Sequence, residues 1–538
     1  MLYYTDKFKG FKLISLELIN HKILGTNTFN FVDYNDNPES IYFSVIIGSN
    51  GTGKSELLKL ILLLFRNICL QDINQRFFNI DGLSKFKLVY FNNGVVYTFS
   101  NFPKNYEPTK ENFSTPIKYI KPYLMEEIKD GRIKEKSFNN ARKTLPISIV
   151  ANSIMLTDKF IVPRNEKEQS LFPMYKYLGV RNRPQQASTR SYTRKTIEFI
   201  VEQVDSLAFT NGMEKLTEFL GLKNSIIVTF NTAYTTHFYT PDIKKSDLDD
   251  YFGDIEEQYK KSETIAPFKL NYYNSIKKEK GLIESLCEFI RTLIREERLN
   301  HIDRSSVKKI IYDVIKNDSH GRLKKEFKYL EHLRLLGLIR SPEVLISTKN
   351  EGSVYLEESS SGEFHLFSTM VSLMATMKSN SLIIIDEPEI SLHPNWQMKY
   401  IEFLRELFSN KEYQTCQIII ATHSHFIISD LKGNSSNILG LRKSNKNEKK
   451  IETVELAKNT YGWSAEDVLY NIFDVSTTRN FYIAREIGEI LKKISKKDYS
   501  ANTLKNKESK LSQIKEGLKE NDPLKSLITK IQEEISNA

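Results

Sequence analysis

Residues 48–55 read Gly48-Ser49-Asn50-Gly51-Thr52-Gly53-Lys54-Ser55. They follow an apolar run from Ile41 to Ile47 that indicates a buried strand, and they precede a Leu-rich segment of helical length from Glu56 to Phe65. A strand, a glycine-rich loop and a helix in this order are the context in which the pattern G-x-x-x-x-G-K-[ST] binds phosphate. The stretch therefore predicts that the chain binds a nucleoside triphosphate. The alternative is a chance glycine-rich turn.

Each residue type in this loop has a chemical reason to be there. Glycines at positions 48, 51 and 53 let the backbone curl, so that its N–H groups converge on a phosphate at the positive end of a helix. Lys54 adds a positive charge for the β- and γ-phosphates, and the Ser55 hydroxyl is a ligand for Mg²⁺. We therefore expect ATP to bind against residues 48–55 and Mg²⁺ to bind Ser55.

Two further apolar strands end in residues that suit phosphate chemistry. The run Leu382 to Ile385 ends in Asp386-Glu387, and the run Gln417 to Ala421 is closed by His423. Asp386 can reach the Mg²⁺ shell, Glu387 is placed to polarise an attacking water, and His423 would face a γ-phosphate. We expect Asp386 to be a metal ligand and Glu387 and His423 to be catalytic. The alternatives are a cap for the next segment and a structural histidine.

A fourth motif, Ser360-Ser361-Gly362-Glu363, begins a helix shortly before the Asp386 strand. By itself this is ordinary helix-cap sequence. A serine hydroxyl at the start of a helix also makes a second cradle for the γ-phosphate, because the positive end of the helix dipole lies there. We therefore expect these four residues to contact ATP.

The length, net charge and cysteine content limit the classes to which the protein can belong. A chain of 538 residues holds more than one domain, and its net charge of +10 permits nucleic-acid binding without proving it. Three widely spaced cysteines make no metal-binding pattern and indicate buried free thiols in a reducing cytoplasm. The longest apolar stretch is too short to span a bilayer, and the N-terminus has no signal-peptide pattern. We expect a cytoplasmic protein without a membrane partner.

The candidate nucleic-acid contacts lie in a polar stretch, residues 164–195, and in the basic helices that follow it. This stretch contains Arg181, Arg183, Arg190 and Arg194, which could contact phosphates without reading bases. The alternative is a solvated loop and helix face.

Alternation of apolar strands with helices predicts an α/β fold whose parallel sheet is covered on both faces. Two hairpins, residues 86–99 and 343–357, add antiparallel strands. Residues 281–298 and 305–336 have the pattern of amphipathic helices. We divide the chain into an N-terminal lobe, a mostly helical insertion, a C-terminal lobe and a helical C-terminal region: residues 1–162, 163–342, 343–430 and 431–538.

The four motifs, in this order, look like the Walker A, signature, Walker B and switch-histidine motifs of ABC-type ATPases, and the long insertion is similar to the SMC and RecF branch. Within that branch, two stretches resemble OLD-like ATPases of bacterial defence systems: Asp386-Glu387-Pro388-Glu389-Ile390-Ser391-Leu392-His393-Pro394 and Ala421-Thr422-His423-Ser424. A looser likeness to PtuA ATPases of Septu systems and their retron-associated relatives rests on Tyr177-Leu178-Gly179, Tyr461-Gly462-Trp463-Ser464 and Thr477-Thr478-Arg479-Asn480. The resemblance implies an ABC-type P-loop head with an antiparallel β layer.

The resemblance also implies partners. Two heads would sandwich ATP in a homodimer or higher homo-oligomer, with residues 48–55 of one chain and residues 360–363 of the other on the same nucleotide. A separate HNH nuclease (PtuB-like) would be docked and restrained, with residues 461–497 as the candidate docking surface and a helical cap as the alternative. Retron-type relatives would add an RNA–DNA hybrid. ABC proteins carry a Gln after the strand that we place at 145–151, whereas this chain has Asn152, which is only a candidate substitute.

Other functions remain in competition with a defence ATPase. An SMC/RecF-like ATPase for DNA maintenance or repair would act directly on DNA, but residues 164–342 lack sustained heptads. Residues 424–538 contain no acidic cluster of nuclease character, so ATP hydrolysis is the chemistry expected of this chain itself. A binding scaffold with a dead site is disfavoured because Lys54, Asp386 and Glu387 are all present.

Overall fold

The computed structural model describes residues 7–33, 35–73, 75–76, 79–83, 85–103, 121–127, 132–183, 186–187, 189–233, 238–262, 267–301, 307–315, 317–349, 352–444, 451–456, 460–473, 481–495, 511–518 and 522–536. The chain divides into two compact units, Met1–Trp463 and Ser464–Ala538, and each is described by itself.

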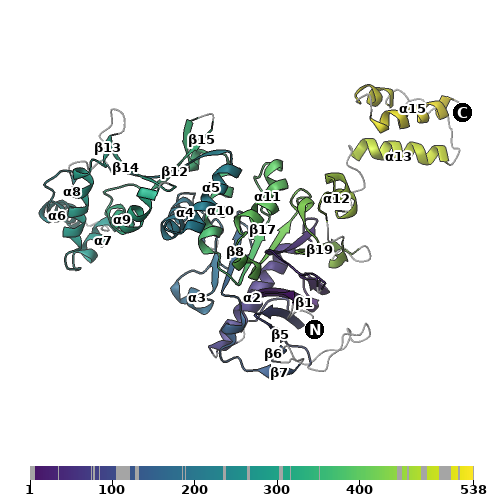
Figure 1. Cartoon of the computed structure of the whole chain (residues 1–538), viewed down its shortest axis with the longest axis horizontal. Coiled ribbons are helices and arrows are strands. Elements are labelled where there is room, and N and C mark those ends of the chain that lie inside the picture. The colour runs from purple at the N-terminus through teal and green to yellow at the C-terminus, as the bar shows by residue number, and fades with distance from the viewer. Residues whose placement is uncertain are drawn as a thin grey trace. The chain divides into compact units, whose positions relative to one another are not determined.

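A seven-stranded sheet forms the centre of the first unit (Figure 1). Its order is β20-β19-β3-β18-β17-β8-β9, and every neighbouring pair is parallel except β19 with β20. All residues of β8, β17 and β18 are buried, as a parallel sheet covered on both faces requires. This confirms the expected α/β class. The strands are β3 (Tyr42–Gly48), β8 (Ser148–Ser153), β9 (Tyr175–Tyr177), β17 (Ser381–Asp386), β18 (Gln417–Thr422), β19 (Ser436–Lys443) and β20 (Ile451–Glu455).

A six-stranded antiparallel sheet of order β2-β1-β4-β5-β6-β7 forms the second layer. The hairpin expected over residues 86–99 is present as β4 and β5, with Asn93 and Gly94 both at positive φ in the two-residue turn. Asn-Gly turns of this kind match the twist of the strands that they join. The strands are β1 (Phe11–His21), β2 (Gly25–Asn30), β4 (Lys85–Asn92), β5 (Val95–Ser100), β6 (Tyr123–Glu127) and β7 (Ile133–Lys136).

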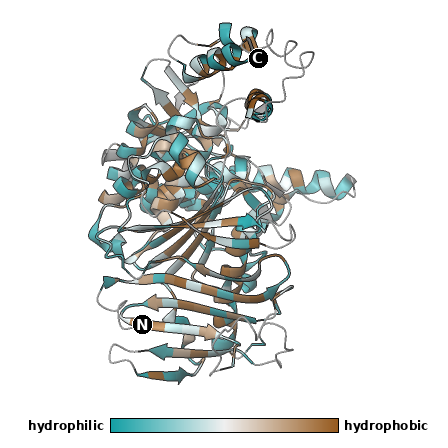
Figure 2. Ribbon diagram, turned by 90° about the vertical axis from the view of Figure 1, so that its right-hand side faces the viewer, coloured by the Kyte–Doolittle hydropathy of each residue, from teal (hydrophilic) through white to brown (hydrophobic). Residues whose placement is uncertain are grey.

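Helix α2 (Lys54–Asp72) packs against both of these sheets. Its residues from Leu57 to Leu70 are buried on nearly every side, and they share one apolar core with residues of β1, β4, β8 and β17. A helix that is apolar all round is a buried helix. Figure 2 shows brown, apolar stretches along many of the strands. The phosphate loop therefore lies at the head of a helix whose body is held by two sheets.

Strands of the insertion and the hairpin expected over residues 343–357 together form a third sheet, which we call the insertion sheet. Five antiparallel strands have the order β13-β14-β12-β15-β16. The expected helix over residues 305–336 is wrong in its first part, because Lys308–Asp313 forms strand β14. Ile310 and Tyr312 are buried while Ile311 is 42% exposed, which is the period of a strand. The strands are β12 (Leu222–Asn231), β13 (Asn300–His301), β14, β15 (Glu343–Thr348) and β16 (Gly352–Tyr355), the last two forming the second expected hairpin.

The helices of the insertion lie partly before β12 and partly between the strands of this sheet. The helix expected over residues 281–298 is confirmed as α8. The helices are α3 (Glu166–Leu171), α4 (Thr189–Gln203), α5 (Leu207–Phe219), α6 (Lys245–Ser262), α7 (Phe268–Ile276), α8 (Leu282–Arg295) and α9 (Asn317–Leu335), and α3 is followed by the short strands β10 (Arg181–Arg183) and β11 (Gln186–Ala187).

Two helices of the C-terminal lobe join the insertion to the nucleotide sheet. Helix α10 (Ser361–Thr376) packs against α4 and α5, and α11 (Pro394–Leu407) also contacts α5. At this crossing the α5 backbone comes very close, since a Cβ added to Gly212 would lie 2.4 Å from Met374 Sδ. The insertion is thus packed directly on the helix that begins with residues 360–363.

The second unit is helical where it is described. It contains α12 (Ala465–Asn471), α13 (Phe481–Ser495) and α15 (Pro523–Ser536), and α13 and α15 share a small apolar core that includes Ile490, Leu511 and Ile528. Residues 477–480, which carry part of the looser resemblance, lie outside the described residues. None of the helices in the described ranges is long and apolar enough to cross a membrane. Cys69, Cys287 and Cys416 are buried free thiols, as expected.

A fully buried lysine, Lys12, joins strand β1 to the segment just before strand β18. Lys12 Nζ donates to the carbonyl oxygens of Lys9, Phe11 and Gln414 at 3.0, 3.1 and 3.1 Å. Burial lowers the pKa of Lys12 from 10.5 to about 7, and Cys416 acts weakly in the other direction. The folded chain binds this proton less tightly than the unfolded chain does. The contribution of Lys12 to the free energy of unfolding is therefore fully present above pH 10.5, and it is lost as the pH falls through about 7.

Lys12→Met should therefore change how stability depends on pH. Relative to this variant, the wild-type free energy of unfolding should rise by at most about 1.4 kcal/mol per pH unit above pH 7 and stay level below that pH. Urea unfolding from about pH 6 to about pH 9 measures the difference. The exposed neighbour Lys9 provides the control, Lys9→Met, which should leave the slope unchanged. Parallel curves for wild type and Lys12→Met would contradict the prediction.

Candidate active site

Parallel register brings three of the sequence motifs to one edge of the central sheet. Asp386 on β17 pairs with Ala421 on β18, and Thr422 at the end of β18 pairs with Ile47 on β3. Strand β3 then leads directly into the phosphate loop. Ligands of open α/β sheets bind outside the carboxyl ends of the strands, so this edge is where a nucleotide site is expected.

The phosphate loop has the backbone geometry that its glycines allow. Gly51 and Gly53 adopt positive φ of 78° and 83°, and a Cβ added to Gly48 would lie 2.3 Å from the carbonyl oxygen of Leu441. Glycine is therefore needed at 53 for its conformation and at 48 for a close approach. Helix α2 begins at Lys54, so the first N–H groups of a long helix are available at this point to an anion.

Three side chains from three motifs meet in front of the loop. Lys54 Nζ lies 2.9 Å from the Gly48 carbonyl oxygen and 2.6 Å from His423 Nε2. The same ring nitrogen lies 3.2 Å from Glu387 Oε1. His423 Nε2 can accept a hydrogen bond from Lys54 or donate one to Glu387, according to the tautomer of the ring. The structure thus brings together the lysine, the histidine and the carboxylate that the sequence singled out.

The charges of this group act on one another. Burial lowers the pKa of Lys54, and the carboxylates of Glu387, Asp386 and Glu389 partly offset that effect. The hydrogen bond with His423 lowers the pKa of Glu387 and outweighs the opposing effect of burial. Glu387 is therefore held as a carboxylate, the form that can accept a proton from water.

Asp386 has an environment that suits a cation. Its side chain is buried, and neither carboxylate oxygen has a hydrogen-bond partner of regular geometry among the described residues. Burial raises the pKa of Asp386 to about 7, while the nearby Ser55 hydroxyl opposes the rise. No cluster of three His, Cys, Asp or Glu side chains that could hold a metal is present in the described ranges. A carboxylate, a hydroxyl and no protein cage fit Mg²⁺, which keeps waters and substrate phosphates in its shell.

The Ser360–Glu363 motif begins α10, and its polar groups bond to one another. The Ser360 N–H donates to Glu363 Oε2 at 3.0 Å, and the Glu363 N–H donates back to Ser360 Oγ at 3.3 Å, which forms a capping box. A Cβ added to Gly362 would lie 2.5 Å from the Ser391 carbonyl oxygen. In the described part of the chain, none of the motif's hydrogen bonds reaches Lys54, Glu387 or His423.

Strand register decides which residue after β8 faces the Asp386 side of the sheet. Asn152 pairs with Ile385, whereas Ser153 pairs with Asp386. Successive side chains of a strand point to opposite faces, so Ser153 shares the face of Asp386 and Asn152 does not. Asn152 instead donates to the Leu178 carbonyl oxygen at 3.3 Å. The sequence named Asn152 only as a candidate substitute, and the register shows that Ser153 is the residue on the Asp386 face.

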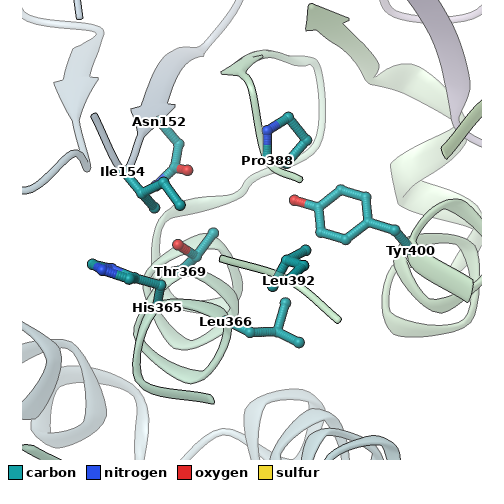
Figure 3. Close-up of a pocket in the computed structure, with 8 residues that line it drawn as sticks. All are labelled: Asn152, Ile154, His365, Leu366, Thr369, Pro388, Leu392 and Tyr400. Atoms are coloured by element: carbon teal, nitrogen blue, oxygen red, sulfur yellow. The ribbon is translucent and has the colours of Figure 1, made fainter. Parts of the chain in front are cut away.

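Asn152 lines a small pocket on the opposite face of the sheet (Figure 3). The pocket lies between the end of β8, helix α10 and the turn after β17, and the Tyr400 side chain of α11 points into it. Its volume is about 10 Å³, which is room for one water molecule. The residues that line it are Asn152, Ile154, His365, Leu366, Thr369, Pro388, Leu392 and Tyr400.

One of the arginines proposed for nucleic-acid contact is buried, which corrects that interpretation. The Arg181 side chain is 8% exposed and forms an ion pair with Asp158, whose side chain is 0% exposed. Arg181 Nε donates to Asp158 Oδ2 at 2.9 Å, and the Tyr177 hydroxyl donates to the same oxygen at 2.7 Å. Arg190 is exposed, Arg194 forms an ion pair with Glu198, and the side chain of Arg183 lies outside what the structure describes.

Arg181→Met should destabilise the fold. The change leaves the Asp158 carboxylate buried without its cation, and breaking a buried ion pair on one side costs about 3–5 kcal/mol. Denaturant unfolding gives the free energy of unfolding directly. Arg190→Met, at an exposed position of the same segment, is the control and should change stability by less than about 0.5 kcal/mol. Equal effects of the two changes would contradict the structural role of Arg181.

Fold and site together define an ABC-type P-loop ATPase head, in which a parallel sheet with a phosphate loop is layered on an antiparallel sheet. The chain belongs to the AAA ATPase domain family, whose model matches residues 8–428, and it is an ATPase.

Among characterised relatives, the chain is similar to the Septu protein PtuA of Bacillus thuringiensis, with 25% identity over 210 residues, 37% of this chain and 44% of that protein. That match spans less than half of the PtuA protein. The chain is also similar to the Retron Ec83 probable ATPase of Escherichia coli, with 22% identity over 461 residues covering 80% of this chain and 72% of the relative. The Retron Vc95 probable ATPase of Vibrio cholerae serotype O1 biovar El Tor is 22% identical over 449 residues, with 79% and 73% covered.

Two solved structures are similar at low identity. The SMC head domain from Thermotoga maritima aligns with 83% of this chain and 99% of its own, at 11% identity and a TM-score of 0.32. The Smc head domain from Pyrococcus furiosus, solved with an extended coiled coil and bound to the C-terminal domain of ScpA, aligns with 83% of this chain and 96% of its own, at 13% identity and a TM-score of 0.30.

Proposed function

We propose that this chain is the ATP-hydrolysing subunit of a bacterial anti-phage defence complex and that it regulates a separate HNH-type nuclease. The observation that carries the catalytic part is the meeting of Lys54, Glu387 and His423 at the carboxyl edge of the sheet. The defence role is supported by similarity to PtuA and to two retron ATPases. A regulatory ATPase also suits a chain whose described residues contain no group of acidic ligands for a nuclease metal.

Each residue of the site has a role in the proposed reaction. The loop from Gly48 to Ser55 holds the phosphates, and Lys54 stabilises the charge on the transferred group. Ser55 and Asp386 would hold Mg²⁺, which when bound neutralises phosphate charge and orients the β- and γ-oxygens. Glu387 accepts a proton from the attacking water, and His423 fixes the Glu387 carboxylate by the contact at 3.2 Å.

We further propose that the active form is a homodimer or higher homo-oligomer with ATP between two heads. Residues 360–363 make no hydrogen bond to Lys54, Glu387 or His423 of their own chain in the described ranges, although they begin a buried helix whose N-terminus suits an anion. A second chain could supply this helix end to the first chain's nucleotide. Binding of ATP would then hold the heads together, and hydrolysis would release them.

A nucleic acid remains a candidate second partner. Arg190 is exposed on α4 and Arg194 is half-exposed on the same helix, so both can contact phosphates without base readout. Because Arg181 is buried against Asp158, the candidate nucleic-acid surface has fewer arginines than the sequence suggested. The residues proposed for docking of the nuclease, 461–497, are partly outside the described ranges.

Purification of the protein together with the products of its neighbouring genes at low salt tests the partnership. Mass spectrometry identifies co-eluting proteins, and nuclease-sensitive staining detects co-eluting nucleic acid. A stoichiometric HNH protein would support the regulatory function, with or without bound nucleic acid. An ATPase that elutes alone and is stimulated by bare DNA would contradict it and favour an SMC/RecF-like maintenance ATPase.

A further inference from the structure

A second carboxylate of the turn after β17 reaches across to the histidine strand. Glu389 Oε1 accepts the backbone N–H of His423 at 2.5 Å. Burial raises the pKa of Glu389, while hydrogen bonds from the His423 amide and the Thr422 hydroxyl act against the rise. Thr422 Oγ1 in turn accepts the N–H of Ser424 at 2.9 Å. One carboxylate thus ties the backbone at the point where β18 ends and the catalytic histidine begins.

A second tie comes from helix α11. Gln397 Nε2 donates to the Leu392 carbonyl oxygen at 2.9 Å, and Gln397 Oε1 accepts the Ser424 hydroxyl at 2.6 Å. Ser424 Oγ also accepts the Phe426 N–H at 3.2 Å. The histidine is therefore held on its N-terminal side by Glu389 and on its C-terminal side by Gln397.

The turn that carries Glu389 has a strained backbone. Glu387 and Ser391 have positive φ of 51° and 65°, a backbone conformation that residues other than glycine rarely adopt. A strained backbone conformation persists where several surrounding contacts hold it in place. Here the Glu387 N–H donates to the Ala421 carbonyl oxygen at 2.8 Å, and with the Glu389 bond this joins the turn to the end of β18 at two points. Gln397 of α11 adds a third bond, to Ser424.

We propose that Glu389 and Gln397 are positioning residues for ATP hydrolysis, which hold His423 at the distance from Glu387 and Lys54 that the reaction needs. The side chains of His423 and Glu387 are 28% and 20% exposed, and both lie beyond the ends of their strands, where the sheet no longer fixes them. A misplacement of about 1 Å in a catalytic group can cost on the order of 100-fold in rate. The inference rests on the proposed ATP site and adds to it two residues that touch no reacting atom.

The competing interpretation is that the Glu389 carboxylate is itself a proton acceptor. Replacing Glu389 by glutamine distinguishes the positioning role from the role of proton acceptor. Glu389→Gln keeps an oxygen that can accept the His423 N–H but removes the charge and the basicity. Glu389→Ala removes the bond as well. A positioning role predicts activity in the glutamine variant and loss in the alanine variant, whereas a proton acceptor predicts loss in both.

The experiment compares four variants of the full chain by steady-state ATPase kinetics, binding of a fluorescent ATP analogue and thermal unfolding. Glu389→Ala and Gln397→Ala should lower kcat by on the order of tenfold or more, with KM and analogue affinity within about twofold of wild type. Glu389→Gln should keep most of kcat. Lys399→Ala, at an exposed position two residues beyond Gln397 on the same helix, is the control and should behave as wild type.

Three results would overturn the proposal. One is an unchanged kcat in Glu389→Ala and Gln397→Ala. Another is a Glu389→Gln variant as inactive as Glu389→Ala. The third is a loss of kcat that is matched by loss of analogue binding and a lowered melting temperature, which indicates a merely structural role. Failure of the ATP site itself would be recognised separately, because Lys54→Ala would then bind the analogue as wild type does.

Discussion

Lys54→Ala should abolish nucleotide binding and with it ATP hydrolysis. Lys54 is buried and its Nζ lies in the group formed with the Gly48 carbonyl and His423, at the start of the helix that would face the phosphates. Removing one partner of a buried, hydrogen-bonded charge pair costs about 2–5 kcal/mol, which is roughly a 30-fold to several-thousand-fold loss of affinity. Titration with a fluorescent ATP analogue measures the loss.

The matched control for this change lies on the same helix. Lys59 has a side chain that is 38% exposed and forms an ion pair with Glu56 at 3.6 Å. Lys59→Ala removes a lysine from α2 without touching the loop and should bind the analogue with wild-type affinity. Melting temperatures of both variants exclude unfolding as the cause. Retained affinity in a folded Lys54→Ala protein would show that residues 48–55 are not the phosphate site.

Glu387→Gln should bind ATP normally and fail to hydrolyse it. The glutamine is isosteric, so it can keep the contact with His423, but it cannot accept a proton from water. Loss of a general base lowers kcat by about 100- to 10,000-fold. If ATP joins two heads, the variant should also accumulate as a dimer that wild type forms only transiently. Single-turnover hydrolysis and size-exclusion chromatography with and without ATP measure the two effects.

Glu406→Gln is the matched control, because Glu406 is exposed on α11 and far along the chain from the turn. It should hydrolyse ATP as wild type does. A Glu387→Gln protein with normal turnover would remove Glu387 from the catalytic role. Loss of turnover without an ATP-dependent dimer would leave the catalytic assignment intact and contradict the sandwich of two heads.

Sequence reasoning located the motifs because each is a local pattern. The phosphate loop, the carboxylates after a buried strand and the Asn-Gly hairpin are all encoded within about ten neighbouring residues. Strand β14 was missed because its apolar residues stand next to a charged helix, and together they imitate one long amphipathic segment. Alternating burial of Ile310, Ile311 and Tyr312 becomes visible only when the strand has its neighbours.

What the sequence could not predict are pairings between distant segments. The burial of Arg181 depends on Asp158, which lies 23 residues earlier. The bond from His423 to Glu389 joins residues 34 positions apart. Whether Asn152 or Ser153 shares the face of Asp386 depends on the strand register, because a shift of one residue places a side chain on the other face of the sheet.

The close crossing at Gly212 has a practical consequence for engineering chimeric proteins. Helices α4 and α5 are shaped to fit α10, and a larger residue at 212 would collide with Met374. Grafts that import another relative's insertion should therefore retain these two helices from the recipient. A natural first junction is Gly221, where φ is 71° and a Cβ would meet nothing within 4 Å. The second junction belongs after Tyr355, so that all five strands of the insertion sheet are exchanged as one piece.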